Sequence, residues 1–140
     1  FLSFYLNDRR KNLSKRKLGL TESKNPPPCS HKPKGVLHCF SGSAEMAKEI
    51  LKLGMYIGLG GALTFKNARR PVEVAEMLPI EKLLLETDCP YMAPVPMRGK
   101  RNYSAYIPYV AEKIAEIKEM TSQEVLNITT QNTKALFNIR

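Results

Sequence analysis

The sequence predicts an α/β fold in which short parallel strands alternate with helices. Two apolar runs of strand length, residues 36–40 and 83–88, each carry a polar residue towards their end. Segments with helical spacing of apolar residues separate and follow these runs. Near-continuous apolar runs of this kind are typical of parallel strands that are covered on both faces. With 43% hydrophobic residues, the 140-residue chain has enough apolar material for a core.

The chain between the two runs predicts a helix, a strand and a second helix. The segment Ser41-Gly42-Ser43 can cap a helix whose apolar side chains share one stripe, and Gly54 can end it as a left-handed residue. Residues 56–61 follow as a strand, in which the glycines mark a turn or the close approach of a ligand. A phosphate-cradling loop is the alternative, although the segment lacks the Lys-Ser/Thr ending of a P-loop. Pro71 can open the second helix and Pro79 can close it.

A loop and further helices follow the second apolar run. Residues 92–106 are rich in proline and basic residues, and this loop is long enough to have a function. The next segment predicts a helix with one apolar face, which is typical of packing on a sheet. Thr121 and Glu124 have capping-box spacing and predict a short helix, and Thr130 or Asn132 can cap a separate last turn.

His38 and Asp88 stand near the ends of the two apolar runs. In parallel α/β folds the chemistry lies at the carboxyl ends of the strands, so both residues are candidates for one shared site and for one metal ion. The alternative is a structural histidine and an aspartate that caps a helix or forms a turn, which is the commoner role of polar residues at strand ends.

Four motifs carry a resemblance to a known enzyme family. They are HCFSGS at residues 38–43, GMYIG at 54–58, LLLETDCPY at 83–91 and RGKRN at 98–102. Through these motifs, residues 35–140 closely resemble the carboxyl-terminal part of the TatD family of metal-dependent deoxyribonucleases. The resemblance implies the carboxyl-terminal portion of a (β/α)8 TIM-like barrel, incomplete in this sequence. It also implies a divalent-metal site at the carboxyl-terminal face of that barrel and hydrolysis of phosphodiester bonds in DNA.

The resemblance further implies roles for four residues. His38 matches a metal-ligand histidine. Asp88 matches the aspartate that ends the last barrel strand, and we expect it to bind metal and, as the catalytic residue, to take a proton from the attacking water. Arg101 and Asn102 match an Arg-Asn loop and are expected to bind a substrate phosphate, with a solvated surface role as the alternative. A nitrogen and oxygen ligand set leaves the metal open among Mg, Mn, Zn and Ni.

Part of the family pattern cannot be placed on this sequence. The family also has a His-x-His pair on its first strand, a glutamate in the middle of the chain and a histidine on the strand before the one matched by His38. His31 is not assigned to a metal, because it lies seven residues ahead of His38 in a Pro-rich and Lys-rich segment. A barrel of this type needs about 250 residues, so a fragment is expected. With two recognised ligands, we expect this polypeptide to show little nuclease activity.

The net charge of +9 is concentrated near the amino terminus. Residues 1–35 hold nine Lys or Arg and two acidic residues, which leaves +2 for the remainder. We expect residues 1–34 to form a basic, disordered arm or a segment that is not native to the fold, and residues 35–140 to form the partial barrel. A nucleic-acid-binding arm is the alternative. We also expect the strand in residues 36–40 to have an unpaired edge.

Cysteine usage and hydropathy suggest a location in the cytoplasm. Cys29, Cys39 and Cys89 are an odd number without CxxC spacing, which is typical of free thiols in a reducing compartment. No apolar run approaches the ~20 residues of a membrane span, and the first residues fit a signal peptide poorly. The first hypothesis is therefore a cytoplasmic, metal-dependent hydrolase with DNA as substrate and no membrane partner. The alternatives are a non-catalytic nucleic-acid-binding or structural remnant, and a related hydrolase that acts on an amide, a lactone or a phosphoester.

Overall fold

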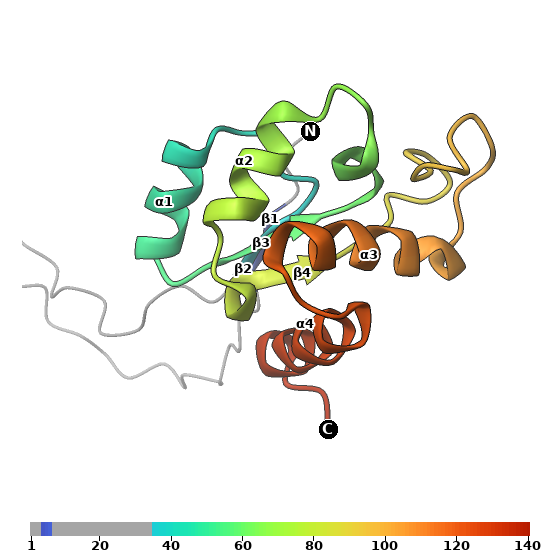
Figure 1. Ribbon diagram of the computed structural model, residues 1–140. Coiled ribbons are helices and arrows are strands. Elements are labelled where there is room, and N and C mark those ends of the chain that lie inside the picture. The colour runs from blue at the N-terminus through green and yellow to red at the C-terminus, as the bar shows by residue number, and fades with distance from the viewer. Residues whose placement is uncertain (1–3, 7–34) are drawn as a thin grey trace, which may run out of the picture.

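The computed structural model describes residues 4–6 and 35–140, which form a four-stranded sheet covered by helices (Figure 1). In chain order the elements are β1 (Phe4–Leu6), β2 (Gly35–Leu37), α1 (Ala44–Lys52), β3 (Tyr56–Leu59), η1 (Gly61–Thr64), α2 (Arg69–Met77), η2 (Ile80–Lys82), β4 (Leu83–Leu85), η3 (Ser104–Tyr106), α3 (Ile107–Lys118) and α4 (Ser122–Phe137), where η marks a short 3-10 helix. None of these helices combines the length and the apolar character that crossing a membrane requires.

The predicted parallel strands are confirmed. The sheet has the order β1-β2-β3-β4, and β2, β3 and β4 run parallel to one another. The strands are shorter than the apolar runs: β2 ends at Leu37 and β4 ends at Leu85. His38 and Asp88 therefore lie just beyond the carboxyl ends of the strands, where the backbone is free to turn.

The edge of β2 differs from the expectation. Phe4–Leu6, within the expected arm, forms β1 and pairs antiparallel with β2, so the edge that was predicted to be unpaired is paired. The rest of residues 1–34, including His31 and Cys29, lies outside the described residues. The division of the chain at residue 34 remains a prediction.

Successive side chains of a strand point to opposite faces of the sheet, so one face packs against helices and the other carries the polar groups of the site. Helices α1, α2 and α3 lie along one side of the sheet, and α4 packs beside η2 and β4 (Figure 1). The side chains that face this helical layer belong to one hydrophobic cluster and are Leu37, Ile57, Leu59, Leu83 and Leu85. Because successive strand residues point to opposite faces, Gly58 and Glu86 lie on the other face.

Capping interactions account for the boundaries of α1 and α4. Ser43 Oγ accepts a hydrogen bond from the Met46 N–H, and Gly54 has a φ of 81°, as predicted for the end of α1. The capping box of Thr121 and Glu124 is present at the start of α4. The predicted break before the last turn is wrong, because α4 is continuous and the Asn132 amide donates to backbone carbonyls outside the helix.

Candidate metal site

Three side chains from the ends of β2 and β4 meet at the carboxyl edge of the sheet. His38 Nε2 lies 2.9 Å from Glu86 Oε2, and His38 Nδ1 lies 3.5 Å from Asp88 Oδ1. Each residue offers one ligand atom such that all three atoms lie within 4.8 Å of one another. His38 and Asp88, which the sequence predicts for one site, therefore lie close together, and Glu86 lies beside them as a third candidate ligand.

Local backbone conformation turns these groups towards one another. Cys39 and Asp88 each have a φ of 50°, a left-handed conformation that aspartate tolerates better than most residues. Cys39 therefore lies in a turn and not on a strand as expected, and its N–H donates to Glu86 Oε1. That bond ties the end of β2 to the carboxylate that follows β4.

Gly58 allows Glu86 to cross the strand between β2 and β4. Gly58 in β3 pairs with Leu84, on the same face as Glu86. A Cβ atom added at Gly58 would lie 2.5 Å from Glu86 Oε2, so a larger residue here would collide with the carboxylate. The predicted close approach at these glycines is therefore made by a side chain of the same molecule.

The site carries an excess of negative charge. Burial, with a contribution from the Asp88 carboxylate, raises the pKa of Glu86 to about 7. Burial, a hydrogen bond to Asp88 and the nearby carboxylates raise the pKa of the Cys39 thiol to about 12, so this thiol stays protonated at neutral pH. A cavity of about 480 Å³ opens here, and its described lining residues include no Lys or Arg.

The residues fit a divalent cation. Two ligands at about 2.1 Å from one ion are at most about 4.2 Å apart, so side-chain movements below an ångström would bring the three ligand atoms into range. A cation would also compensate the two carboxylates, because the cavity's described lining residues include no Lys or Arg. Glu86 can serve as a third ligand, or it can hold the His38 ring while the other ring nitrogen binds.

The raised pKa of Glu86 predicts a pH dependence of stability in EDTA. The unfolded chain releases this proton near the ordinary pKa of 4.5, whereas the folded chain keeps it until about pH 7. The free energy of unfolding should therefore fall as the pH rises from about 4.5 to about 7. Urea unfolding across this range measures the change. The Glu86→Gln variant cannot titrate at this position and should give a flatter curve, and an unaltered slope in that variant would contradict this explanation.

Asn102 does not lie where a substrate phosphate could reach it. Its side chain is buried, with the residue 2% exposed, and its amide donates to the carbonyls of Thr87 and Tyr91. Its Oδ1 accepts from the Tyr103 N–H at 2.9 Å. In place of the expected phosphate contact, Asn102 closes the loop that begins at Asp88.

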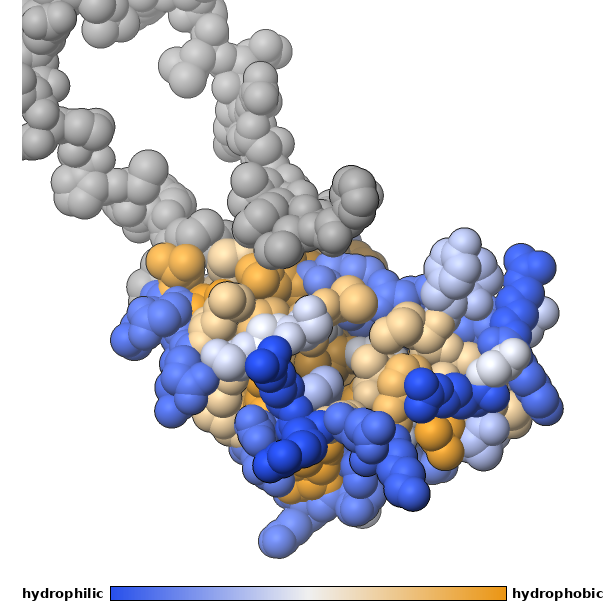
Figure 2. Space-filling view, turned by 90° about the horizontal axis from the view of Figure 1, so that it is seen from above, coloured by the Kyte–Doolittle hydropathy of each residue, from blue (hydrophilic) through white to orange (hydrophobic). Residues whose placement is uncertain are grey.

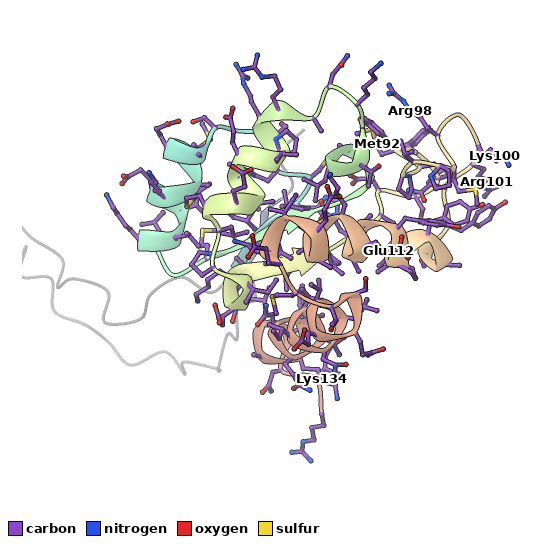
Figure 3. The ribbon with its side chains drawn as sticks, viewed as in Figure 1. Met92, Arg98, Lys100, Arg101, Glu112 and Lys134 are labelled. Carbon is purple, nitrogen blue, oxygen red and sulfur yellow. The ribbon has the colours of Figure 1, made fainter. Side chains whose placement is uncertain are left out.

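Arg101 is exposed on the same loop and lies outside the residues that line the site cavity. Its guanidinium lies 5.8 Å from the centre of the Tyr103 ring. Figure 3 shows Arg101 beside Lys100 at the outer end of the loop. Ser104 in η3 and Ile107 at the start of α3 also line the cavity.

Comparison with known proteins identifies the family. Residues 14–138 match the sequence profile described as TatD related DNase. The chain belongs to the TatD family. A relative from Bacillus subtilis, the uncharacterized metal-dependent hydrolase YabD, is 55% identical over 105 residues, which cover 75% of this chain and 41% of YabD. The uncharacterized metal-dependent hydrolase YcfH of Escherichia coli is 46% identical, over 75% of this chain and 40% of YcfH.

Solved TatD structures confirm the fold. The crystal structure of YjjV, a TatD homologue from Escherichia coli, matches with a TM-score of 0.69 at 34% identity, over 75% of this chain and 40% of that chain. A TatD-family hydrolase from Entamoeba histolytica matches with a TM-score of 0.65 at 25% identity, over 74% and 42%. The chain thus has the α/β architecture of a TatD-type barrel and spans about 40% of the length of these relatives.

Glu86 was missed at the sequence level, although a signal for it was present. It lies two residues before Asp88, and residues i and i+2 of a strand face the same side. An ionisable residue that continues an apolar strand needs a partner, because burying an unpaired carboxylate is costly. The pattern Glu86-Thr87-Asp88 after β4 could therefore have predicted two carboxylates at one site.

Proposed function

We propose that the whole protein hydrolyses phosphodiester bonds in DNA with a divalent cation held at His38, Glu86 and Asp88. The observation that carries the proposal is the set of three ligand atoms within 4.8 Å at the carboxyl edge of the sheet. The TatD-family match supports DNA as the substrate class. When bound, a divalent cation would polarise the phosphoryl group and make water a better nucleophile at neutral pH.

His38 and Glu86 act as one positioned unit in this proposal. His38 binds through a neutral ring nitrogen, which requires that the ring be held at the correct angle. The contact of 2.9 Å between His38 Nε2 and Glu86 Oε2 supplies that restraint. The Glu86 side chain is 10% exposed and is itself held by the Cys39 N–H, so it has little freedom to move.

Asp88 takes the proton from the attacking water. Its side chain is 20% exposed and lines the open cavity, so both water and a phosphate can reach it. The water oxygen forms a bond to phosphorus, the bond from phosphorus to the leaving oxygen breaks, and the water proton moves to the Asp88 carboxylate. Arg101 provides a cation on the adjoining loop that can contact a flanking phosphate.

A chimaera with a longer relative tests this function. Residues 35–138 of this chain would replace the matching segment of YabD, which this chain covers to 41%. We expect Mn²⁺-dependent cleavage of a fluorescent DNA oligonucleotide, reduced at least about 100-fold by Asp88→Asn or His38→Ala. The 140-residue chain by itself should show little cleavage, since it spans 41% of the length of YabD and the active sites of such barrels are built from the ends of several strands.

Two further measurements separate the outcomes. Metal content and circular dichroism of the chimaera establish that it is folded and loaded. A folded, metal-loaded chimaera that leaves DNA intact but cleaves an amide or a lactone would exclude DNA as the substrate and favour a related hydrolase. Robust cleavage by the 140-residue chain alone, abolished by His38→Ala, would show that this part of the family fold is sufficient.

A further inference from the structure

A second cavity, separate from the metal site, lies among the helices. It has a volume of about 450 Å³ and is formed by η1, the segment that follows it, the start of α2 and the middle of α3. Its charged lining residues are Lys66, Arg69, Lys113 and Glu73. We name it the basic cavity, because three of these four side chains are cationic.

Most of the positive charge in the basic cavity is uncompensated. Lys113 Nζ pairs with Glu116 at 2.8 Å. Among residues 35–140, no carboxylate lies within ion-pair distance of Lys66 or Arg69, and both residues are exposed. Strongly hydrophilic side chains are visible on this side of the molecule (Figure 2). Glu73 is the one acidic side chain that lines the cavity, so an anion would meet a net positive charge.

Arg98 lies at the rim of the basic cavity. Its guanidinium lies 4.2 Å from the centre of the Phe65 ring, and Phe65 lines the basic cavity. A guanidinium stacked on an aromatic ring keeps its edge N–H groups available for two parallel bonds to a phosphate. Figure 3 shows Arg98 on the inner part of the loop, apart from Lys100 and Arg101. The loop that presents Arg98 begins directly after Asp88.

We propose that the basic cavity, with Arg98 at its rim, binds a backbone phosphate of a nucleic acid whose cleaved bond lies at the metal site. Nucleic acid as the ligand rests on the proposed function. Cations on exposed flexible side chains and one planar guanidinium stacked on an aromatic ring suit a contact to phosphate that is independent of base sequence. The cavity thus positions the substrate and takes no part in bond cleavage.

The test compares the salt dependence of binding in EDTA, where hydrolysis is suppressed. The full chain, the double variant Lys66→Ala/Arg69→Ala and a matched control Lys48→Ala/Lys134→Ala would be titrated into a fluorescein-labelled oligonucleotide at several salt concentrations. The control removes the same charge from exposed positions on α1 and α4, and Lys134 lies far from Arg98 (Figure 3). The amino-terminal basic residues are identical in all three proteins.

We expect the double variant to lower the slope of log affinity against log salt by about 0.7–0.9 for each phosphate that is no longer bound, and the control to leave the slope nearly unchanged. Arg98→Ala should lower the slope by about the same amount again. Equal slopes for the double variant and the control would overturn the proposal, as would a full chain that binds no DNA at low salt. Competition by polyglutamate as strong as competition by DNA would identify an acidic polypeptide as the ligand and also overturn it.

The salt titration and the cleavage assay can fail separately. A slope that falls as expected, together with a metal-loaded chimaera that leaves DNA intact, would support the basic cavity and reject the nuclease activity. DNA cleavage by the chimaera with unchanged slopes in the variants would support the activity and reject the basic cavity.

Discussion

Replacing Asn102 with alanine is expected to destabilise the protein by about 3 kcal/mol. The substitution leaves the Thr87 and Tyr91 carbonyls and the Tyr103 N–H without their side-chain partner, and removing each such bond in a buried setting costs about 1 kcal/mol. Because Asn102 also closes the loop that begins at Asp88, the left-handed conformation of Asp88 should relax. Urea unfolding measures the first effect.

A substitution at an exposed asparagine separates the loss of buried hydrogen bonds from the general effect of replacing an asparagine. Asn127 is exposed and its side chain accepts a single bond from Gln123 in the same helix, so Asn127→Ala should change the stability by less than about 0.5 kcal/mol. Asn102→Asp keeps the acceptor but loses the paired amide donors, and should be destabilised nearly as much as Asn102→Ala. A loss of stability below about 1 kcal/mol in both Asn102 variants would show that the loop does not depend on this amide.

Replacing Gly58 with alanine is expected to weaken divalent-metal binding by about 10–100-fold with little loss of stability. The added Cβ would lie 2.5 Å from Glu86 Oε2, so the carboxylate must move away from its place beside His38. The obstructed atoms belong to the end of a side chain and not to the backbone, so the fold can adjust. Isothermal titration with Mn²⁺ and thermal unfolding of the same samples would show the two effects separately.

Gly42→Ala serves as the control for this experiment. Its added Cβ would also meet the ends of side chains, at 2.7 Å from Phe40 and 2.9 Å from Met46, but it does not approach Glu86. Comparable stability of the two variants with a loss of metal affinity in the Gly58→Ala variant alone is the expected pattern. Unaltered affinity in the Gly58→Ala variant would mean that Glu86 is not needed to hold the metal.

The sequence predicted the strands and two of the site residues because these depend on local patterns. The apolar runs located β2 and β4, and the polar residues that follow them placed His38 and Asp88 at one edge of a parallel sheet. The caps of α1 and α4 could be predicted for the same reason, since the Ser43 and Thr121 hydroxyl oxygens accept hydrogen bonds from backbone N–H groups three positions later.

Features that depend on contacts distant in sequence could not be predicted in this way. Asn132 resembled a cap, but its amide bonds to the carbonyls of Ile80 and Leu83, which are distant in the sequence. Asn102 resembled a phosphate ligand, but it is buried beneath the loop that it closes. Gly58 acquires its role through the Glu86 side chain, which crosses β3 to reach the end of β2.

Electron paramagnetic resonance of free Mn²⁺ during titration of the 140-residue chain tests the central claim most directly. The account predicts that one Mn²⁺ binds per chain and that His38→Ala and Asp88→Asn each abolish this binding. Glu112→Gln should bind as the unaltered chain does, because Glu112 is exposed on α3 (Figure 3) and is not one of the three candidate ligands. Equal Mn²⁺ binding in all four proteins would contradict the assignment of the metal site to His38, Glu86 and Asp88.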